Sequence, residues 1–185
     1  MTMRFIEKEF FARNTLEVAR RLLGMKLIYG ESEGMIVETE AYRDDPASHA
    51  VTKPQKGKML IETYGCIYIF FIYGMYHCLN FTTEKDGIGA VLIRAVEPLS
   101  GIERMQSRRK ISNFKNLSNG PGKLFIAFGL HPSKHGERVG DSIHLQKHCK
   151  FTDGEIVTTS RIGISKATDL PWRFCVNGSE FLSKF

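Results

Sequence analysis

The feature that most constrains the fold is a pair of apolar runs separated by a four-residue turn. Residues 66–72 read Cys-Ile-Tyr-Ile-Phe-Phe-Ile, residues 73–76 read Tyr-Gly-Met-Tyr, and residues 77–83 read His-Cys-Leu-Asn-Phe-Thr-Thr. β-Branched and aromatic residues favour strands, and a glycine-containing turn between two such runs favours a hairpin. The sequence therefore predicts an antiparallel hairpin near the middle of the chain.

Signals on either side of the hairpin indicate an α+β fold. The pairs Asn14 with Glu17 and Ser100 with Glu103 resemble capping boxes, and Pro121 stands where a helix often begins. We therefore expect helices that begin at these positions, in a single domain over residues 1–185. Further strands are predicted at residues 26–29, 35–39, 90–95, 156–160, 162–164 and 173–176, and residues 41–65 are predicted to be a long loop.

The first residues and the cysteines favour a cytoplasmic protein, nucleoid-associated in a bacterium and not secreted. The N-terminal residues contain no apolar segment followed by a small-residue cleavage site. The longest apolar run, residues 67–73, is far shorter than the roughly 20 residues of a membrane span, so no membrane partner is expected. Cys66, Cys78, Cys149 and Cys175 form no Cys-x-x-Cys pair, and we expect reduced thiols.

Positive charge is concentrated in two parts of the chain. The formal net charge is +6, and residues 104–136 contain no acidic residue. Clustered cations suit a polyanion, because each neutralised phosphate releases counterions. The charge alone is equally compatible with a solvated basic face. The two basic segments comprise Arg104, Arg108, Arg109, Lys110, Lys115, Lys123 and Lys134, and Lys53, Lys56 and Lys58.

Two acids and a phenol alternate at the end of the strand predicted around residue 39. Glu38, Glu40 and Tyr42 would share one face of an extended chain. The spacing alone favours a solvated face of an edge strand, with an active site as the alternative. Arg94 lies in another apolar strand and needs a partner if it is buried. The candidates are Glu40 and Glu97, and the ion pair would be either functional or purely structural.

The hairpin turn carries side chains that suit contact with nucleic acid. Tyr73 and Met75 would project from the turn, where they could form a stacking platform or a wedge that enters a duplex. Core packing is the alternative for the aromatic residues of this hairpin. We expect it for Phe71 and Ile72.

Histidines at four-residue spacing raise the possibility of a metal site. His131 with His135, and His144 with His148 next to Cys149, fit no named zinc motif. We therefore expect no metal. The segment 120–123, Gly-Pro-Gly-Lys, is too short for a phosphate-binding loop, and no other cofactor is expected.

Five short motifs follow one another along the chain. They are Ile-Val-Glu-Thr-Glu-Ala-Tyr at 36–42, Ala-Ser-His at 47–49, the hairpin sequence at 68–80, Val-Leu-Ile-Arg-Ala-Val-Glu-Pro at 91–98 and Asn-Gly-Pro-Gly-Lys-Leu at 119–124. In this order they resemble the mammalian-type alkyladenine (3-methyladenine) DNA glycosylase family. Residues 161–164 and 171–174 also resemble it, so the resemblance covers nearly the whole chain. The expected architecture is a curved, mostly antiparallel sheet or open barrel with flanking helices and a protruding β-hairpin.

The resemblance implies roles for individual residues. Glu40 matches the general base that activates water, and Arg94 matches a residue that helps to hold that water together with the main chain near Ile162. Tyr42 and His49 match residues around the flipped base.

The other carried-over positions lie on the predicted hairpin. Tyr73 matches the residue that inserts into the DNA, with Met75 beside it. Asn80 matches the residue that disfavours the 2-amino group of guanine. Phe70 occupies a position that is usually tyrosine in this family, so its ring can still stack but a hydroxyl hydrogen bond is lost.

The implied activity is that of a monofunctional DNA glycosylase, a monomer that excises alkylated or deaminated purines from damaged double-stranded DNA without a cofactor. Two alternatives remain. One is a nucleic-acid-binding module without catalysis, and the other is a hydrolase directed at RNA or nucleotides, because the family's core resembles the C-terminal domain of methionyl-tRNA formyltransferase. The residues expected to contact the DNA backbone are Lys53, Lys56, Lys58, Arg108, Arg109, Lys110 and Lys123.

Overall fold

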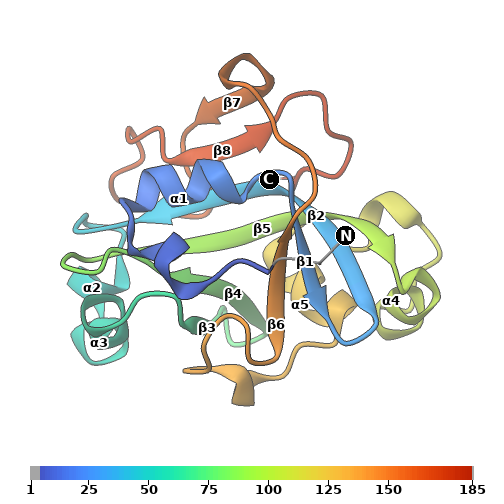
Figure 1. Cartoon of the computed structure of the whole chain (residues 1–185), viewed down its shortest axis with the longest axis horizontal. Coiled ribbons are helices and arrows are strands. Elements are labelled where there is room, and N and C mark those ends of the chain that lie inside the picture. The colour runs from blue at the N-terminus through green and yellow to red at the C-terminus, as the bar shows by residue number, and fades with distance from the viewer. Residues whose placement is uncertain (1–4, 185) are drawn as a thin grey trace.

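The computed structural model describes residues 5–184 as a curved sheet with helices on both sides (Figure 1). Residues 1–4 and Phe185 lie outside the described residues. Residues 1–4 are the start of the N-terminal segment for which no export signal is predicted. All strand pairs are antiparallel, in the order β3-β4-β5-β2-β1-β6, with β8 on β2 and β7 on β8. The expected α+β class and open, mostly antiparallel sheet are thereby confirmed.

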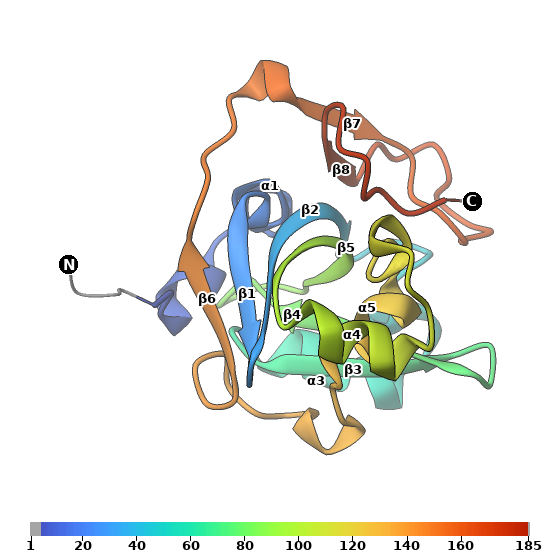
Figure 2. The ribbon, with the colours of Figure 1, turned by 90° about the vertical axis from the view of Figure 1, so that its right-hand side faces the viewer.

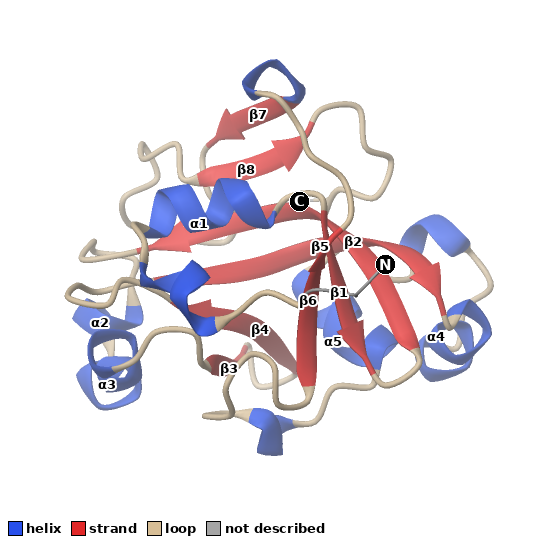
Figure 3. Ribbon diagram, in the orientation of Figure 1, coloured by secondary structure: helices blue, strands red, loops and turns tan. Residues whose placement is uncertain are grey.

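The strands and helices have the following bounds (Figure 3). The strands are β1 Met25–Tyr29, β2 Ser32–Tyr42, β3 Ile67–Ile72, β4 Tyr76–Thr82, β5 Ala90–Ser100, β6 Ile143–Lys147, β7 Ile156–Thr159 and β8 Arg173–Val176. The α-helices are α1 Thr15–Leu22, α2 His49–Thr52, α3 Pro54–Glu62, α4 Ile102–Arg109 and α5 Pro121–Phe128, with short 3-10 turns at Lys8–Ala12, Phe114–Asn116, Pro132–Lys134 and Asp153–Glu155.

The two long strands β2 and β5 form the middle of the sheet. The start of β2 pairs with β1 and its later part pairs with β8, while β5 runs along its other edge. Their register shifts between Ile36 and Glu38 and again between Glu38 and Thr39. Such bulges bend a strand and re-aim its side chains, and the curvature of β2 and β5 is visible in Figure 2.

Helix α1 covers one side of β2. The Asn14 side chain accepts a hydrogen bond from the backbone N–H of Leu16 and so caps the helix, as predicted. The apolar positions Val18, Ala19 and Leu22 are fully buried. Helix α5 begins at Pro121 as predicted and packs on β4 and β5.

The predicted loop at 41–65 is wrong, because this segment contains α2 and α3. The Ser48 side chain caps α2, and Pro54 opens α3 at its first turn. A side chain at Gly57 would lie 2.3 Å from the carbonyl oxygen of His49, so glycine permits the two helices to touch. Pro54 and Gly57, which indicate a loop in the sequence, therefore begin a helix and permit a contact between two helices.

Three other local predictions are wrong. Strand β5 continues to Ser100, so α4 begins after Gly101, whose φ of 72° places it in the left-handed region. Residues 162–164 form an irregular loop, and the short strand β6 was not predicted. Phe71 is 49% exposed rather than part of the core, because it lies near the tip of the hairpin, beyond the buried part of β3. Within residues 5–184, no helix is long and apolar enough to cross a membrane.

The packing of β4 generates a stability prediction. Phe81 is fully buried, with its ring 5.6 Å from that of Phe11. Phe81→Ala should lower the free energy of unfolding by about 3–5 kcal/mol, because it leaves a cavity. Phe71→Ala, at an exposed position of the neighbouring strand, should cost about 1 kcal/mol or less. Urea denaturation of both variants measures the difference, and equal losses would contradict this core assignment.

Candidate active site

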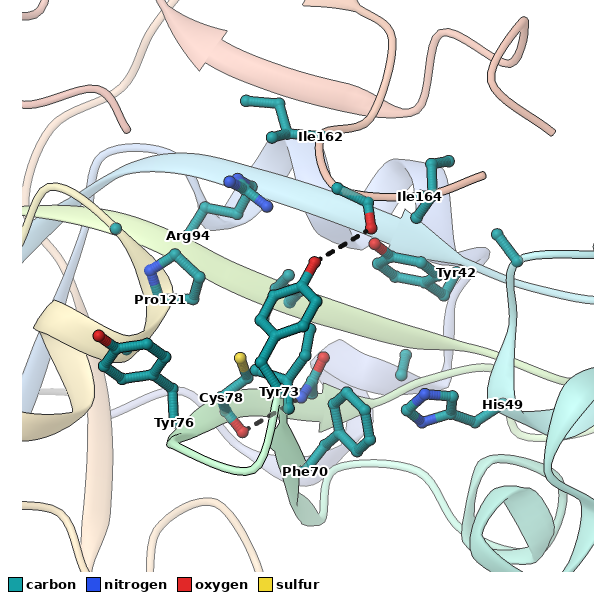
Figure 4. A pocket seen from close by; sticks show the side chains of 18 of the residues that line it. Tyr42, His49, Phe70, Tyr73, Tyr76, Cys78, Arg94, Pro121, Ile162 and Ile164 are labelled. Atoms are coloured by element: carbon teal, nitrogen blue, oxygen red, sulfur yellow. Dashed lines mark hydrogen bonds between the residues drawn. The ribbon is translucent and has the colours of Figure 1, made fainter. Parts of the chain in front are cut away.

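A cavity of about 830 Å³ opens between the β3–β4 hairpin, the end of β2, the first half of β5 and the start of α5 (Figure 4). The loop around Ile162 and the C-terminal residues Ser183 and Lys184 complete its wall. The curved sheet therefore brings together segments that are distant in sequence. Six of the residues assigned to catalysis and base binding line this cavity: Tyr42, His49, Phe70, Asn80, Arg94 and Ile162.

Glu40 lies directly behind that wall and is fully buried. Its Oε1 is 3.3 Å from Nη1 of Arg94 and accepts a hydrogen bond of 2.7 Å from the backbone N–H of Ile162. Its Oε2 accepts a hydrogen bond of 2.9 Å from the Tyr42 hydroxyl. The solvated edge-strand alternative is therefore wrong. Arg94 pairs with Glu40, and also with Glu38, rather than with Glu97.

Burial changes the acid–base character of Glu40. Removal of water raises the pKa of the Glu40 carboxyl above its ordinary value, and this effect outweighs Arg94, the Ile162 N–H and the Tyr42 hydroxyl, all of which lower it. A carboxylate with a raised pKa takes up a proton more readily than an exposed one. Such a group suits general-base catalysis near neutral pH.

Aromatic rings form the part of the cavity beside Glu40. Tyr42 lies on the β2 side, and Phe70 lies on the hairpin with its ring centroid 4.0 Å from that of His49 (Figure 4). The Tyr68 hydroxyl and Nδ1 of His49 are 2.9 Å apart. Burial first, and then the charges of Lys53 and Lys56, lower the pKa of His49 to about 4, so the imidazole is neutral at neutral pH. Burial raises the pKa of Tyr68 to about 12, so its hydroxyl keeps its proton.

The hairpin tip projects as expected. Tyr73 and Met75 are 72% and 67% exposed. Tyr73 has a positive φ of 55° and is followed by Gly74 at 65°, a tight turn that directs the Tyr73 ring across the mouth of the cavity (Figure 4). There its hydroxyl lies 3.5 Å from the carbonyl oxygen of Gly163.

Asn80 is buried on β4 at the inner end of the cavity. Its amide nitrogen donates to the carbonyl oxygens of Tyr68, at 3.1 Å, and Cys78, at 3.4 Å. These two bonds fix the orientation of the side chain against the cavity. Asn80 is therefore a fixed part of the cavity wall.

Cations surround the cavity mouth, and no acidic side chain is among its described lining residues. Arg109, Lys123 and Lys53 were expected near a polyanion, whereas Lys166 and Lys184 were missed because each stands apart from the basic clusters. Other basic residues of the acid-free segment form ion pairs at the surface: Arg104 with Glu31, Lys115 with Glu180 and Lys134 with Glu137.

The remaining expected backbone contacts lie outside the cavity wall. Arg108 donates to Ser32 and to the Ala127 carbonyl, and Lys58 pairs with Glu62. Lys110 is exposed at the end of α4, and Lys56 is exposed on α3. Arg108 thus has a structural role in joining α4 to α5 and the sheet.

A second buried ion pair holds the loop that carries Ile162. Arg161 donates to both oxygens of Asp45, at 2.7 and 3.2 Å, and to the Ala41 carbonyl. Its guanidinium lies between the rings of Tyr42 and Trp172, 4.7 and 5.1 Å from their centroids. Sequence reasoning missed this pair, since nothing local links positions 116 residues apart.

The histidines do not gather into a metal site among residues 5–184, where no three His, Cys, Asp or Glu side chains are placed to hold an ion. Nδ1 of His131 bonds to Ser133, and Nδ1 of His135 bonds to the backbone of Ile69. His144 packs on Phe5.

Comparisons with known proteins point to one family. The methylpurine-DNA glycosylase family matches residues 9–180. Three relatives carry the name "Putative 3-methyladenine DNA glycosylase". The protein of Prosthecochloris aestuarii is 41% identical over 96% of this chain and 90% of its own length. That of Rhodopseudomonas palustris is 42% identical over 95% and 86%, and that of Alkaliphilus oremlandii is 40% identical over 97% and 98%. With a buried carboxylate behind an aromatic cavity and this match along nearly its full length, the chain belongs to the methylpurine-DNA glycosylase family, enzymes that hydrolyse N-glycosyl bonds in DNA.

Proposed function

We propose that this protein is a monofunctional glycosylase of the mammalian type, which turns an alkylated or deaminated purine out of duplex DNA and hydrolyses its bond to deoxyribose. The substrate class comprises 3-methyladenine, 7-methylguanine, hypoxanthine and ethenoadenine. The observation that carries the proposal is the position of Glu40, a buried carboxylate held by Arg94 and the Ile162 N–H behind an aromatic slot. It would act as a monomer in the compartment that holds the DNA.

The hairpin and the cations would bind the DNA. A base inside a duplex cannot reach the cavity, and turning it out costs a few kcal/mol. Tyr73 and Met75 at the exposed tip would fill the gap that the base leaves and offset part of this cost. The cations at the cavity mouth would hold the phosphates of the bent strand.

The aromatic slot would select damaged purines. A cationic base such as 7-methylguanine between Tyr42 and Phe70 gains on the order of 0.5–2 kcal/mol from their π faces. A neutral base would instead depend on hydrogen bonds, for which the neutral His49 is available beside Tyr68.

Glu40 would supply the chemistry. As the bond from C1′ to the base breaks, the sugar develops oxocarbenium character, which a nearby carboxylate stabilises. Glu40 takes a proton from a water that attacks C1′, and the base leaves with the bonding electrons. Arg94 and the Ile162 N–H hold the carboxylate in place. Because water is the nucleophile, no lysine adduct forms and the DNA strand stays intact.

The role of Glu40 predicts a separation of binding from catalysis. Glu40→Gln keeps the size of the side chain but removes the base, so excision should fall by about 10²–10⁴-fold while affinity for lesion DNA is retained. The assay incubates duplex oligonucleotides carrying single alkylated or deaminated purines and measures the free bases. Normal excision by the variant would refute the role of Glu40. No base release by the wild-type protein would favour a binding module instead.

The exposed hairpin tip predicts a defect in lesion binding. Tyr73→Ser removes the ring that would enter the duplex, so affinity for lesion DNA should fall by about 10-fold or more, on the scale of a lost stacking interaction. Phe114→Ser, at an exposed aromatic residue away from the cavity, serves as the control. Titration of fluorescent duplexes with and without the lesion measures both, and an unchanged Tyr73→Ser affinity would contradict the insertion.

The position of Asn80 predicts an effect on selectivity. Asn80→Ser shortens the side chain at the inner end of the cavity and should admit the 2-amino group of guanine. Release of normal guanine from undamaged DNA should therefore rise relative to release of hypoxanthine. If the ratio of the two rates matches that of the wild-type protein, Asn80 does not discriminate against guanine.

A further inference from the structure

Glu38 is a second buried carboxylate, two residues before Glu40 on β2. It has no exposed surface. Its Oε1 accepts hydrogen bonds from Nε of Arg173 at 2.7 Å, Nε of Arg94 at 3.1 Å and Oγ of Ser183 at 2.7 Å. Its Oε2 accepts one of 2.6 Å from the backbone N–H of Ser183. The carboxylate thus joins β2, β5, β8 and the C-terminal segment.

Arg94 stands between the two carboxylates. The β2–β5 register shifts here, since Glu38 faces Ala95 and Thr39 faces Ile93. This bulge leaves Arg94 without a directly opposed residue and lets its guanidinium turn inward. The guanidinium then contacts Glu38 through Nε and Glu40 through Nη1.

Ser183 binds the same guanidinium at Nε, where Glu38 also binds, and at Nη2. Its Oγ lies 3.3 Å from Nε and 3.2 Å from Nη2 of Arg94, as well as 2.7 Å from Glu38. The hydroxyl can donate its proton to the carboxylate and accept from Arg94 at once. A buried guanidinium needs such partners, because its fork of N–H groups has no water to bind.

We propose that Glu38 and Ser183 are positioning residues for catalysis, which aim Nη1 of Arg94 at Glu40, so that the C-terminal segment is part of the active site. This inference rests on the proposed glycosylase function. Glu38 touches no group that reacts, and it contacts the site through Arg94. A small rotation of Arg94 would move the cation that orients Glu40, and displacements of about 1 Å can cost 10²-fold in rate.

Loss of either residue should raise the pKa of Glu40. Neutralisation of Glu38 removes a repulsion that raises this pKa, but it also loosens Arg94, whose charge lowers the pKa by more, so the pKa should rise. Loss of the Ser183 hydroxyl leaves all charges in place but loosens Arg94. Because the charge of Arg94 lowers the pKa of Glu40, that pKa should then rise. The ionisable groups around Glu40 are Glu38 and Tyr42 on β2, Arg94 on β5, Cys78 on β4, and Arg173 and Cys175 on β8.

The test measures single-turnover excision of 7-methylguanine from a duplex oligonucleotide against pH. This base is already cationic, so the acid limb reports the general base. Ser183→Ala should slow excision by roughly 10-fold and Glu38→Gln by roughly 100-fold, and both should move the acid limb to higher pH. Affinity for lesion DNA should be unchanged in both. Ser179→Ala, which removes a hydroxyl of the same segment that bonds only to the Phe181 N–H, should match the wild-type protein.

Two results would overturn the inference while leaving the proposed function intact. One is wild-type rates in both variants, and the other is weakened DNA binding in both, which signals general loosening of the fold. If Glu38→Gln does not fold, Ser183→Ala decides alone: an unchanged rate and acid limb would refute positioning. No base release by the wild-type protein would refute the proposed function itself.

Discussion

The buried charge cluster of Glu38, Glu40, Arg94 and Arg173 is the constraint on which the rest of the structure depends. Two carboxylates and two guanidinium groups share one dehydrated region where three strands meet. Each charge would be costly alone, and removal of one partner from such a pair typically costs about 3–5 kcal/mol. The bulges in β2 and β5, the pairing of β8 with β2 and the return of the C-terminal segment to Glu38 at Ser183 all serve to satisfy these groups.

This arrangement would let Glu40 be both buried and reactive, as its proposed role as general base requires. Glu40 is surrounded by donors from a side chain on its own strand, a neighbouring strand and a distant loop. The loop is held in turn by Arg161, whose charge is neutralised by Asp45 and enclosed by two aromatic rings. The reactive group is therefore oriented by interactions that are formed before any substrate binds, which is how enzymes avoid reorganisation during the reaction.

Local patterns in the sequence predicted the hairpin, the N-cap of α1, the start of α5 at Pro121, and the shared face of Glu38, Glu40 and Tyr42. The resemblance to known glycosylases supplied the assignments around the cavity. The partners of Arg161, Glu38 and Ser183 could not be found in this way, because each contact joins segments far apart in the chain and depends on how the sheet curves. Helices α2 and α3 were missed for a different reason: they are short, and their proline and glycine serve packing that only the fold reveals.

The distribution of cations has a consequence for association with DNA. Three basic residues away from the cavity, Arg104, Lys115 and Lys134, pair with glutamates at the surface, whereas no acidic side chain is among the described residues that line the cavity beside its cations. Long-range attraction would then guide a duplex toward the hairpin rather than to the surface at large. Each phosphate held there releases about 0.9 of a condensed counterion. The slope of log affinity against log salt concentration would therefore report how many DNA phosphates are bound at the cavity mouth.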